Sequence, residues 1–198
     1  MKFALLLLLA LPAHADELLG GILKRLAEPR VVRAQFVQER TLADLERPSL
    51  SRGRIVVSRE QGVLWQIESP VKLTLAFTPN GIVQTGADGV RRRQAQRRGA
   101  VETETARLMQ GILGADEASL KATFDARAAG SLERWTMRLA PRARETARYL
   151  REVRLSGGGR LETIEIEETS GNYTVIRMKQ VAVGERLEPD ELEYFKAP

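Results

Sequence analysis

The sequence predicts a mainly β protein of the α+β class, built on one strongly curved antiparallel sheet. This sheet would form an incomplete barrel, with helices covering its open concave side. Three observations predict this fold: roughly ten or eleven short segments have the two-residue period of strands, only two or three have a helical period, and no repeat, low-complexity linker or composition shift marks a second domain. We therefore expect residues 16–198 to form a single domain.

Residues 1–15 are expected to be a cleavable signal peptide that directs export to the periplasm. Lys2 supplies a positive n-region, residues 3–11 are a short apolar run, and Ala13-His14-Ala15 matches the A-x-A cleavage pattern. The apolar run is too short to span a bilayer as a helix. An exported, unanchored periplasmic domain is therefore predicted, the alternative being a retained N-terminal membrane anchor.

The predicted elements follow in order along the chain. An amphipathic helix over residues 16–28 ends at Pro29. Predicted strands follow at residues 31–42, 50–58, 63–67, 71–77, 82–85 and 90–96. A helical period returns over residues 102–113, and further strands are expected at 120–126, 135–139, 148–155, 161–167 and 173–181. Residues 142–150 could also form a short helix, and periodicity does not decide between the two.

One row of large apolar side chains is the most informative feature for function. Its members share one parity, so neighbouring strands would place them on a single face. They are Val63, Trp65, Ile67, Val71, Leu73, Leu75 and Phe77. Such a row is either a hydrophobic core or the wall of a cavity.

Composition excludes several kinds of chemistry. The chain has no cysteine, and its only histidine, His14, falls in the predicted signal. Thiol catalysis, a Ser-His-Asp triad and ordinary zinc sites are thereby excluded, so we expect no catalytic residue, no metal and no cofactor. Loss of Lys2 with the signal would lower the formal charge from +5 to +4. This basic balance indicates acidic partners or anionic lipid surfaces and not nucleic acid.

The chain resembles the periplasmic outer-membrane lipoprotein carriers, the LolA-like proteins, over essentially its whole mature length. The order and spacing of several short motifs carry the resemblance. They are Phe36-Val37-Gln38, Gly53 opening a strand that ends at Arg59, Trp65, Pro70, Leu139-Ala140-Pro141 and a terminal Phe195.

The resemblance implies an incomplete barrel capped by helices, with a hydrophobic cavity that takes acyl chains. The expected cavity wall is Phe36, Val63, Trp65, Ile67, Leu73, Leu75 and Phe77. Arg59 matches the family arginine that helps to close a lid, and a guanidinium with five donors suits that task. The alternative for Arg59 is a solvated side chain at a strand end. The apolar face of residues 102–113 is either core or lid, and it consists of Leu108, Met109, Ile112 and Leu113.

A basic run departs from the family pattern, which indicates a divergent relative and not the housekeeping carrier. It consists of Arg91, Arg92, Arg93, Arg97 and Arg98. These residues are either a solvated strand and turn whose charge discourages edge pairing, or a surface that docks an acidic partner or lipid headgroups.

The expected function is a monomeric periplasmic carrier for acyl chains of lipoproteins or lipids, with no enzymatic activity. It would receive cargo from an inner-membrane donor, deliver it to an outer-membrane acceptor and touch membranes only peripherally. Two alternatives remain at this point. The same fold could be an interaction or sensor domain that binds an envelope protein, or a carrier for a lipid-like product, such as a polyene, of a dedicated export system.

Overall fold

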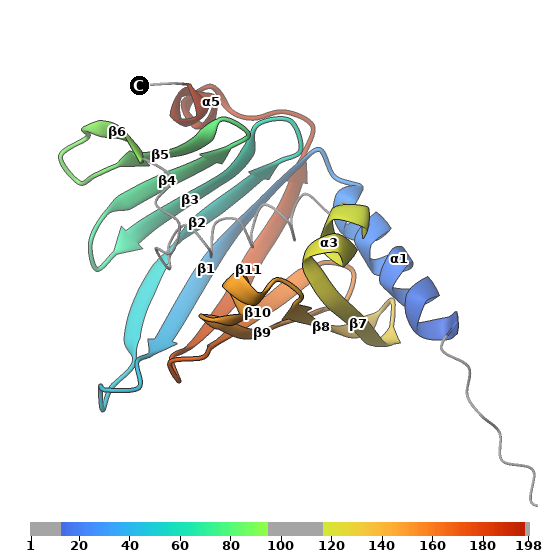
Figure 1. Cartoon of the computed structure of the whole chain (residues 1–198). Helices are drawn as coiled ribbons and strands as arrows, with labels where there is room; N and C mark the ends of the chain where they lie inside the picture. The colour runs from blue at the N-terminus through green and yellow to red at the C-terminus, as the bar shows by residue number, and fades with distance from the viewer. Residues whose placement is uncertain (1–12, 95–116, 197–198) are drawn as a thin grey trace, which may run out of the picture.

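The computed structural model describes residues 13–94 and 117–196. Its centre is one antiparallel eleven-stranded sheet in the order β6-β5-β4-β3-β2-β1-β11-β10-β9-β8-β7 (Figure 1). The first half of the sheet contains β1 (Val31–Thr41), β2 (Ser49–Ser58), β3 (Gly62–Ser69), β4 (Leu73–Thr78), β5 (Gly81–Thr85) and β6 (Arg91–Gln94). The second contains β7 (Phe124–Ser131), β8 (Arg134–Pro141), β9 (Leu150–Gly157), β10 (Leu161–Glu168) and β11 (Tyr173–Gly184).

Two meanders are joined through the long central strands. β1 pairs with β2 on one side and with β11 on the other, so the first and last strands of the chain meet in the middle of the sheet. The edges β6 and β7 are not paired with each other, so the curved sheet stays open (Figure 1). This is the incomplete barrel that the sequence predicts.

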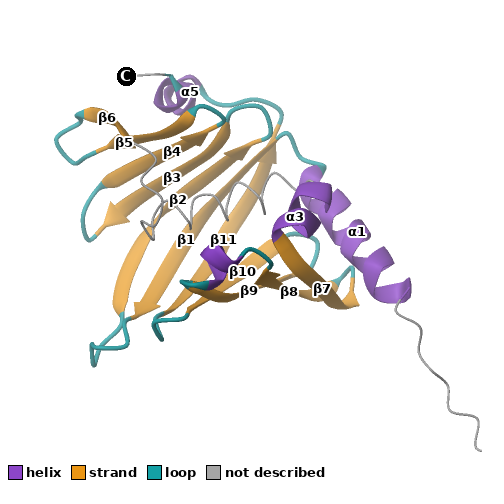
Figure 2. Cartoon of the chain, in the orientation of Figure 1, coloured by secondary structure: helices purple, strands orange, loops and turns teal. Residues whose placement is uncertain are grey.

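Four short helices accompany the sheet in the described residues. They are α1 (Ala13–Ala27), α3 (Glu117–Thr123), α4 (Arg144–Ala147) and α5 (Pro189–Phe195). Figure 2 shows α1 and α3 together beside β7, and α5 apart from them near the β3–β5 end of the sheet. Leu19 of α1 and Leu120 of α3 join the main core, so we call the face that they cover the concave face.

The sequence prediction was wrong at residues 120–126, which were expected to be a strand. The structure has α3 up to Thr123 and begins β7 at Phe124. The physical reason is spacing: the two buried side chains, Leu120 and Phe124, are four residues apart, which fits a helical turn as well as an alternating strand. Over so short a segment the two periods cannot be told apart.

Val71 does not belong to the apolar row in which its parity placed it. β3 continues to Ser69 and β4 begins only at Leu73, so Val71 lies in the turn between them with 67% of its surface exposed. The undecided segment 142–150 contains one helical turn, α4, before β9 begins.

The sheet also has a second, smaller core on its outer face, because β3 is apolar on both faces. Leu64 points away from the concave face and packs with Val56, Ala76 and Val83 under Phe195 of α5. Sequence patterning does not predict α5, because its capping box pairs Glu188 with Glu191 and does not begin with Ser or Thr.

The outer face of the second half of the sheet is polar. Its side chains form a continuous network of ion pairs and hydrogen bonds across the four strands β8, β9, β10 and β11. Arg154 contacts Glu152 at 2.9 Å and Glu165 at 3.0 Å, and Arg138 contacts Glu152 on the other side. The Tyr173 hydroxyl donates a hydrogen bond to Glu165 at 2.6 Å. Hydrogen bonding to Arg138 lowers the pKa of Glu152, so the Glu152 carboxylate stays ionised at neutral pH.

Tyr173 should titrate late and make the fold sensitive to strong alkali. Burial, and then the hydrogen bond to the Glu165 carboxylate, raise the pKa of Tyr173 to about 12 from the unfolded value of 10.0. Because the folded pKa is the higher one, this contribution to stability is complete below pH 10 and is lost as the pH rises towards 12. An absorbance titration of tyrosinate should therefore show a late step that Tyr173→Phe lacks. Identical curves for the two proteins would contradict this prediction.

Candidate functional site

The β3–β4 hairpin holds the predicted cavity wall on one face. Its register pairs Val63 with Phe77, Trp65 with Leu75 and Ile67 with Leu73, so the six side chains form three cross-strand pairs. Phe36 reaches the same cluster from β1. Parity therefore placed the six hairpin residues together correctly. The contact of these six residues and Phe36 with a ligand stays a prediction.

These side chains pack against one another closely. The rings of Phe36 and Trp65 have centroids 4.4 Å apart and planes at 41°, a tilted aromatic contact. Trp65 is only 6% exposed, and Ile67 and Leu73 at the end of the hairpin are half-buried. In the described structure this part of the concave face is core, and none of the seven predicted wall residues lines a described pocket.

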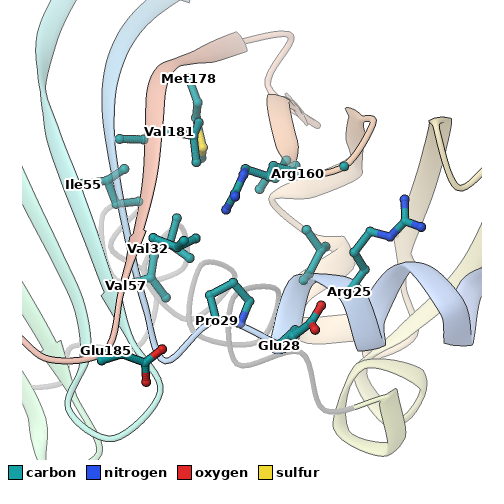
Figure 3. Close-up of a pocket in the computed structure, with 16 residues that line it drawn as sticks. Arg25, Glu28, Pro29, Val32, Ile55, Val57, Arg160, Met178, Val181 and Glu185 are labelled. Carbon is teal, nitrogen blue, oxygen red and sulfur yellow. The ribbon is translucent and has the colours of Figure 1, made fainter.

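An apolar pocket of about 330 Å³ lies further along the same face (Figure 3). It is bounded by the C-terminal end of α1, the first residues of β1, the ends of β2 and β11, and the β9–β10 turn. Its apolar lining consists of Leu26, Pro29, Val32, Ala34, Ile55, Val57, Leu161, Met178, Val181 and Val183.

Strand pairing builds the wall of this pocket. Val32 of β1 lies between Val57 of β2 and Val183 of β11 in the register, which gives a row of valines over three neighbouring strands. Deeper in, Ala34 pairs with Ile55, and Ile55 in turn pairs with Trp65. The pocket is therefore continuous with the predicted wall, although the residues that line the pocket are not among the predicted wall residues.

A β-bulge in β11 supplies two side chains that a regular strand would separate. Between the pairs Gln35–Lys179 and Arg33–Ala182 the strand β11 has one extra residue, and Gln180 has a positive φ of 50°. Met178 and Val181 are three residues apart, so in a regular strand they would point to opposite faces. The bulge turns both to the concave face, where both line the pocket (Figure 3). Nothing in the sequence marks Gln180 as a bulge residue, since it is neither Gly nor Asn.

Four charged residues line the pocket, Arg25, Glu28, Arg160 and Glu185, and two of them have partners among the described residues. Arg25 donates a hydrogen bond to the Leu132 carbonyl at 2.8 Å, and Glu185 is 3.9 Å from Arg30. Arg160 extends from the β9–β10 turn towards the pocket, as Figure 3 shows. Within residues 13–94 and 117–196, no ion pair or side-chain hydrogen bond involves the Arg160 guanidinium.

Arg59 lies in the β2–β3 turn close to this region. Its backbone N–H donates to the Arg30 carbonyl at 3.1 Å, and its exposed side chain lines a hollow beside Lys24 and Glu28 of the α1 end. The other predicted lid residues, Leu108, Met109, Ile112 and Leu113, lie outside the described residues. The lid therefore stays a prediction.

The members of the predicted basic run differ in their surroundings. Arg91 is half-buried and donates hydrogen bonds to the carbonyls of Tyr194, at 3.2 Å, and Lys196, so it fastens the end of the chain and is not a free surface charge. Arg92 is exposed, 3.7 Å from Asp88, and Arg93 is exposed. Arg97 and Arg98 lie outside the described residues. Docking by the exposed members remains a prediction.

The described part of the chain contains no group of three or more Asp, Glu, His or Cys side chains arranged to hold a metal ion. None of the helices in that part is both long enough and apolar enough to cross a membrane.

The described structure is an open antiparallel half-barrel with a mainly apolar pocket on its concave face. The chain belongs to the outer membrane lipoprotein carrier protein LolA-like family, whose model it matches over residues 11–182. No curated protein matches the chain.

Solved structures share the fold at low sequence identity. An outer membrane lipoprotein-sorting protein domain from Vibrio parahaemolyticus is 11% identical, with a TM-score of 0.51, covering 90% of this chain and 95% of that one. A chain of the MucA/MucB complex from Pseudomonas aeruginosa is 14% identical, with a TM-score of 0.51, covering 93% of this chain and 61% of that one. A LolA superfamily protein from Nitrosomonas europaea is 14% identical, with a TM-score of 0.48 and coverages of 89% and 96%.

Proposed function

We propose that this protein is a periplasmic carrier that holds an acyl chain of a lipoprotein or lipid in the concave-face pocket during transfer towards the outer membrane. The observation that carries the proposal is the pocket of about 330 Å³ with a mainly apolar lining. Membership of the LolA-like family, a family of carrier and binding proteins, supports it.

The energetics of the pocket suit a carrier. Each methylene removed from water contributes about 0.8 kcal/mol, so burying eight of them supplies about 6 kcal/mol before the costs of binding. The thioether of Met178 can adapt to chains of different shape. Val183 at the rim is 50% exposed, so a bound chain would stay partly accessible to an acceptor protein. We expect a donor at the inner membrane and an acceptor at the outer membrane.

A second candidate is a periplasmic interaction or sensor domain. Two observations support it: most of the predicted wall around Trp65 is closely packed core, and the fold is similar to that of a chain in the MucA/MucB complex. This candidate predicts a stable protein partner and no bound lipid. A carrier for a polyene or other lipid-like product would use the same pocket and differ only in the extracted cargo.

Native mass spectrometry and organic extraction of protein purified from periplasm would test the proposal, together with a variant that puts a charge into the pocket. Val181→Glu should lower lipid loading by roughly tenfold or more, because a carboxylate in the aliphatic wall must be desolvated by a bound chain. Val37→Glu is the matched control. Val37 is half-buried on the outer face between Arg52 and Arg177 in the register, so the new charge has partners there.

The expected result is acyl species bound to the wild type and to Val37→Glu but largely absent from Val181→Glu. Protein that stays free of lipid after incubation with solubilised lipids would overturn the carrier proposal in favour of the interaction domain. Equal loading of both variants would show that cargo lies elsewhere.

A further inference from the structure

We infer that the concave-face pocket selects an amphiphile with an anionic head, a carboxylate or a phosphate, and that Arg160 receives this head. The inference rests on the proposed function, because it assumes that the same pocket holds an acyl chain. To the proposed function it adds the charge of the ligand's head group and the orientation of the ligand in the pocket.

Arg160 is the charged group best placed for this role. Its side chain starts in the β9–β10 turn, directly before the pocket residue Leu161, and extends towards the apolar lining (Figure 3). An arginine that stays ionised and presents a planar fork of donors matches carboxylate and phosphate oxygens in two parallel hydrogen bonds. Its aliphatic stem can lie along the apolar wall while the guanidinium stays at the mouth.

The other charges at the pocket favour one orientation of the ligand. Figure 3 shows Glu28 and Glu185 on the side of the pocket where Pro29 lies, away from the Arg160 guanidinium. These two carboxylates would repel an anionic head. Arg25 is already engaged with the Leu132 carbonyl, so it is less available to bind a head group than Arg160. An anionic head would therefore be held at Arg160, with the acyl chain lying against Val32 and Ile55 of the apolar wall.

The test compares binding of dodecanoate, dodecyl phosphate and dodecanol below their aggregation limits, by isothermal titration calorimetry or native mass spectrometry. Wild-type protein should bind the two anions about tenfold to a hundredfold more tightly than the neutral alcohol, since a charge-assisted hydrogen bond adds to the same chain burial. Arg160→Gln should remove this preference, because it should weaken binding of the two anions far more than binding of dodecanol. The matched control, Arg52→Gln, removes an exposed arginine from the outer face and should keep the preference.

The two possible failures can be told apart. If dodecanol binds as tightly as the anions, or if Arg160→Gln keeps the preference, the head-group inference is overturned while the carrier proposal stands. If none of the three amphiphiles binds to wild-type protein, the carrier proposal itself fails and this inference with it. A preference for only one anion identifies the head as carboxylate or as phosphate and supports the assignment of Arg160.

Discussion

Trp65→Ala is expected to lower the free energy of unfolding by about 3–5 kcal/mol, the largest single-residue effect on stability that we predict. Trp65 is buried at 6% exposure, contacts the Phe36 ring and lies opposite both Leu75 and Ile55 in the register. Removing the indole leaves a cavity that strands on both sides cannot close, because their positions are fixed by the ladders. A loss of this size is a large share of the 5–15 kcal/mol typical of a folded domain.

Chemical denaturation followed by circular dichroism measures this effect without relying on tryptophan fluorescence. Val71→Ala is the matched control, because Val71 has the same parity in the sequence as Trp65 but is exposed in the β3–β4 turn. The control should change stability by less than about 0.5 kcal/mol. A comparable loss in both variants would mean that the row continues through the turn and that the observed register is wrong.

The position of Trp65 also affects how ligand binding should be tested. Introducing a charge at Trp65 or Leu75 would place it in a closely packed core, so lost loading would report unfolding as much as lost contact. Val181 and Arg160 are better sites for substitution, because both line the pocket and neither is fully buried.

The sheet itself could be predicted because its strands obey the two-residue period. Alternation located the β3–β4 hairpin and placed Val63, Trp65, Leu75 and Phe77 on one face, as the register confirms. Alternation depends on each residue's own polarity, so it needs no knowledge of distant partners. It failed at Leu120 and Phe124, where only two apolar residues define the segment and both periods fit.

The pocket could not be predicted, because it depends on pairing between distant parts of the chain. Val32 and Val183 become neighbours only when β1 pairs with β11. The bulge at Gln180 then changes which face Val181 occupies, and a period counted along the sequence cannot detect this change. Nothing in the sequence marks Arg160 as a pocket residue either, because the β9–β10 turn comes close to the end of α1 only in the folded structure.

The second large effect is expected at the contact that holds α5 on the outer face. Glu191 accepts hydrogen bonds from Arg33 at 2.7 and 2.6 Å, and it also accepts one from the Glu188 backbone N–H at 2.8 Å. Glu191 is 9% exposed, and its hydrogen bonds raise the pKa of the Arg33 guanidinium above its ordinary value. Glu191→Ala should therefore cost about 1.5–3 kcal/mol, because it leaves a charged and half-buried Arg33 without its partner and removes the helix cap.

Glu193→Ala on the same helix is the matched control, because Glu193 is exposed and its one ion pair among the described residues is with the exposed Lys196. That surface pair should contribute less than about 1 kcal/mol. Equal effects of the two substitutions would contradict a special role for the Arg33–Glu191 contact. The double variant Arg33→Met/Glu191→Leu should recover much of the loss, since replacing a buried pair with apolar residues removes the desolvation cost of both charges.

Hydrogen exchange would show which parts of the fold lose stability in these variants. In Glu191→Ala, the amides of α5 should exchange faster, and the outer core around Leu64 should lose protection because Phe195 no longer covers it firmly. The concave-face pocket lies on the opposite side of the sheet, so binding of dodecanoate should be nearly unchanged under conditions where the variant stays folded. A parallel loss of ligand binding would show that the two faces are coupled through β1, whose Arg33 faces α5 while Val32 and Ala34 line the pocket.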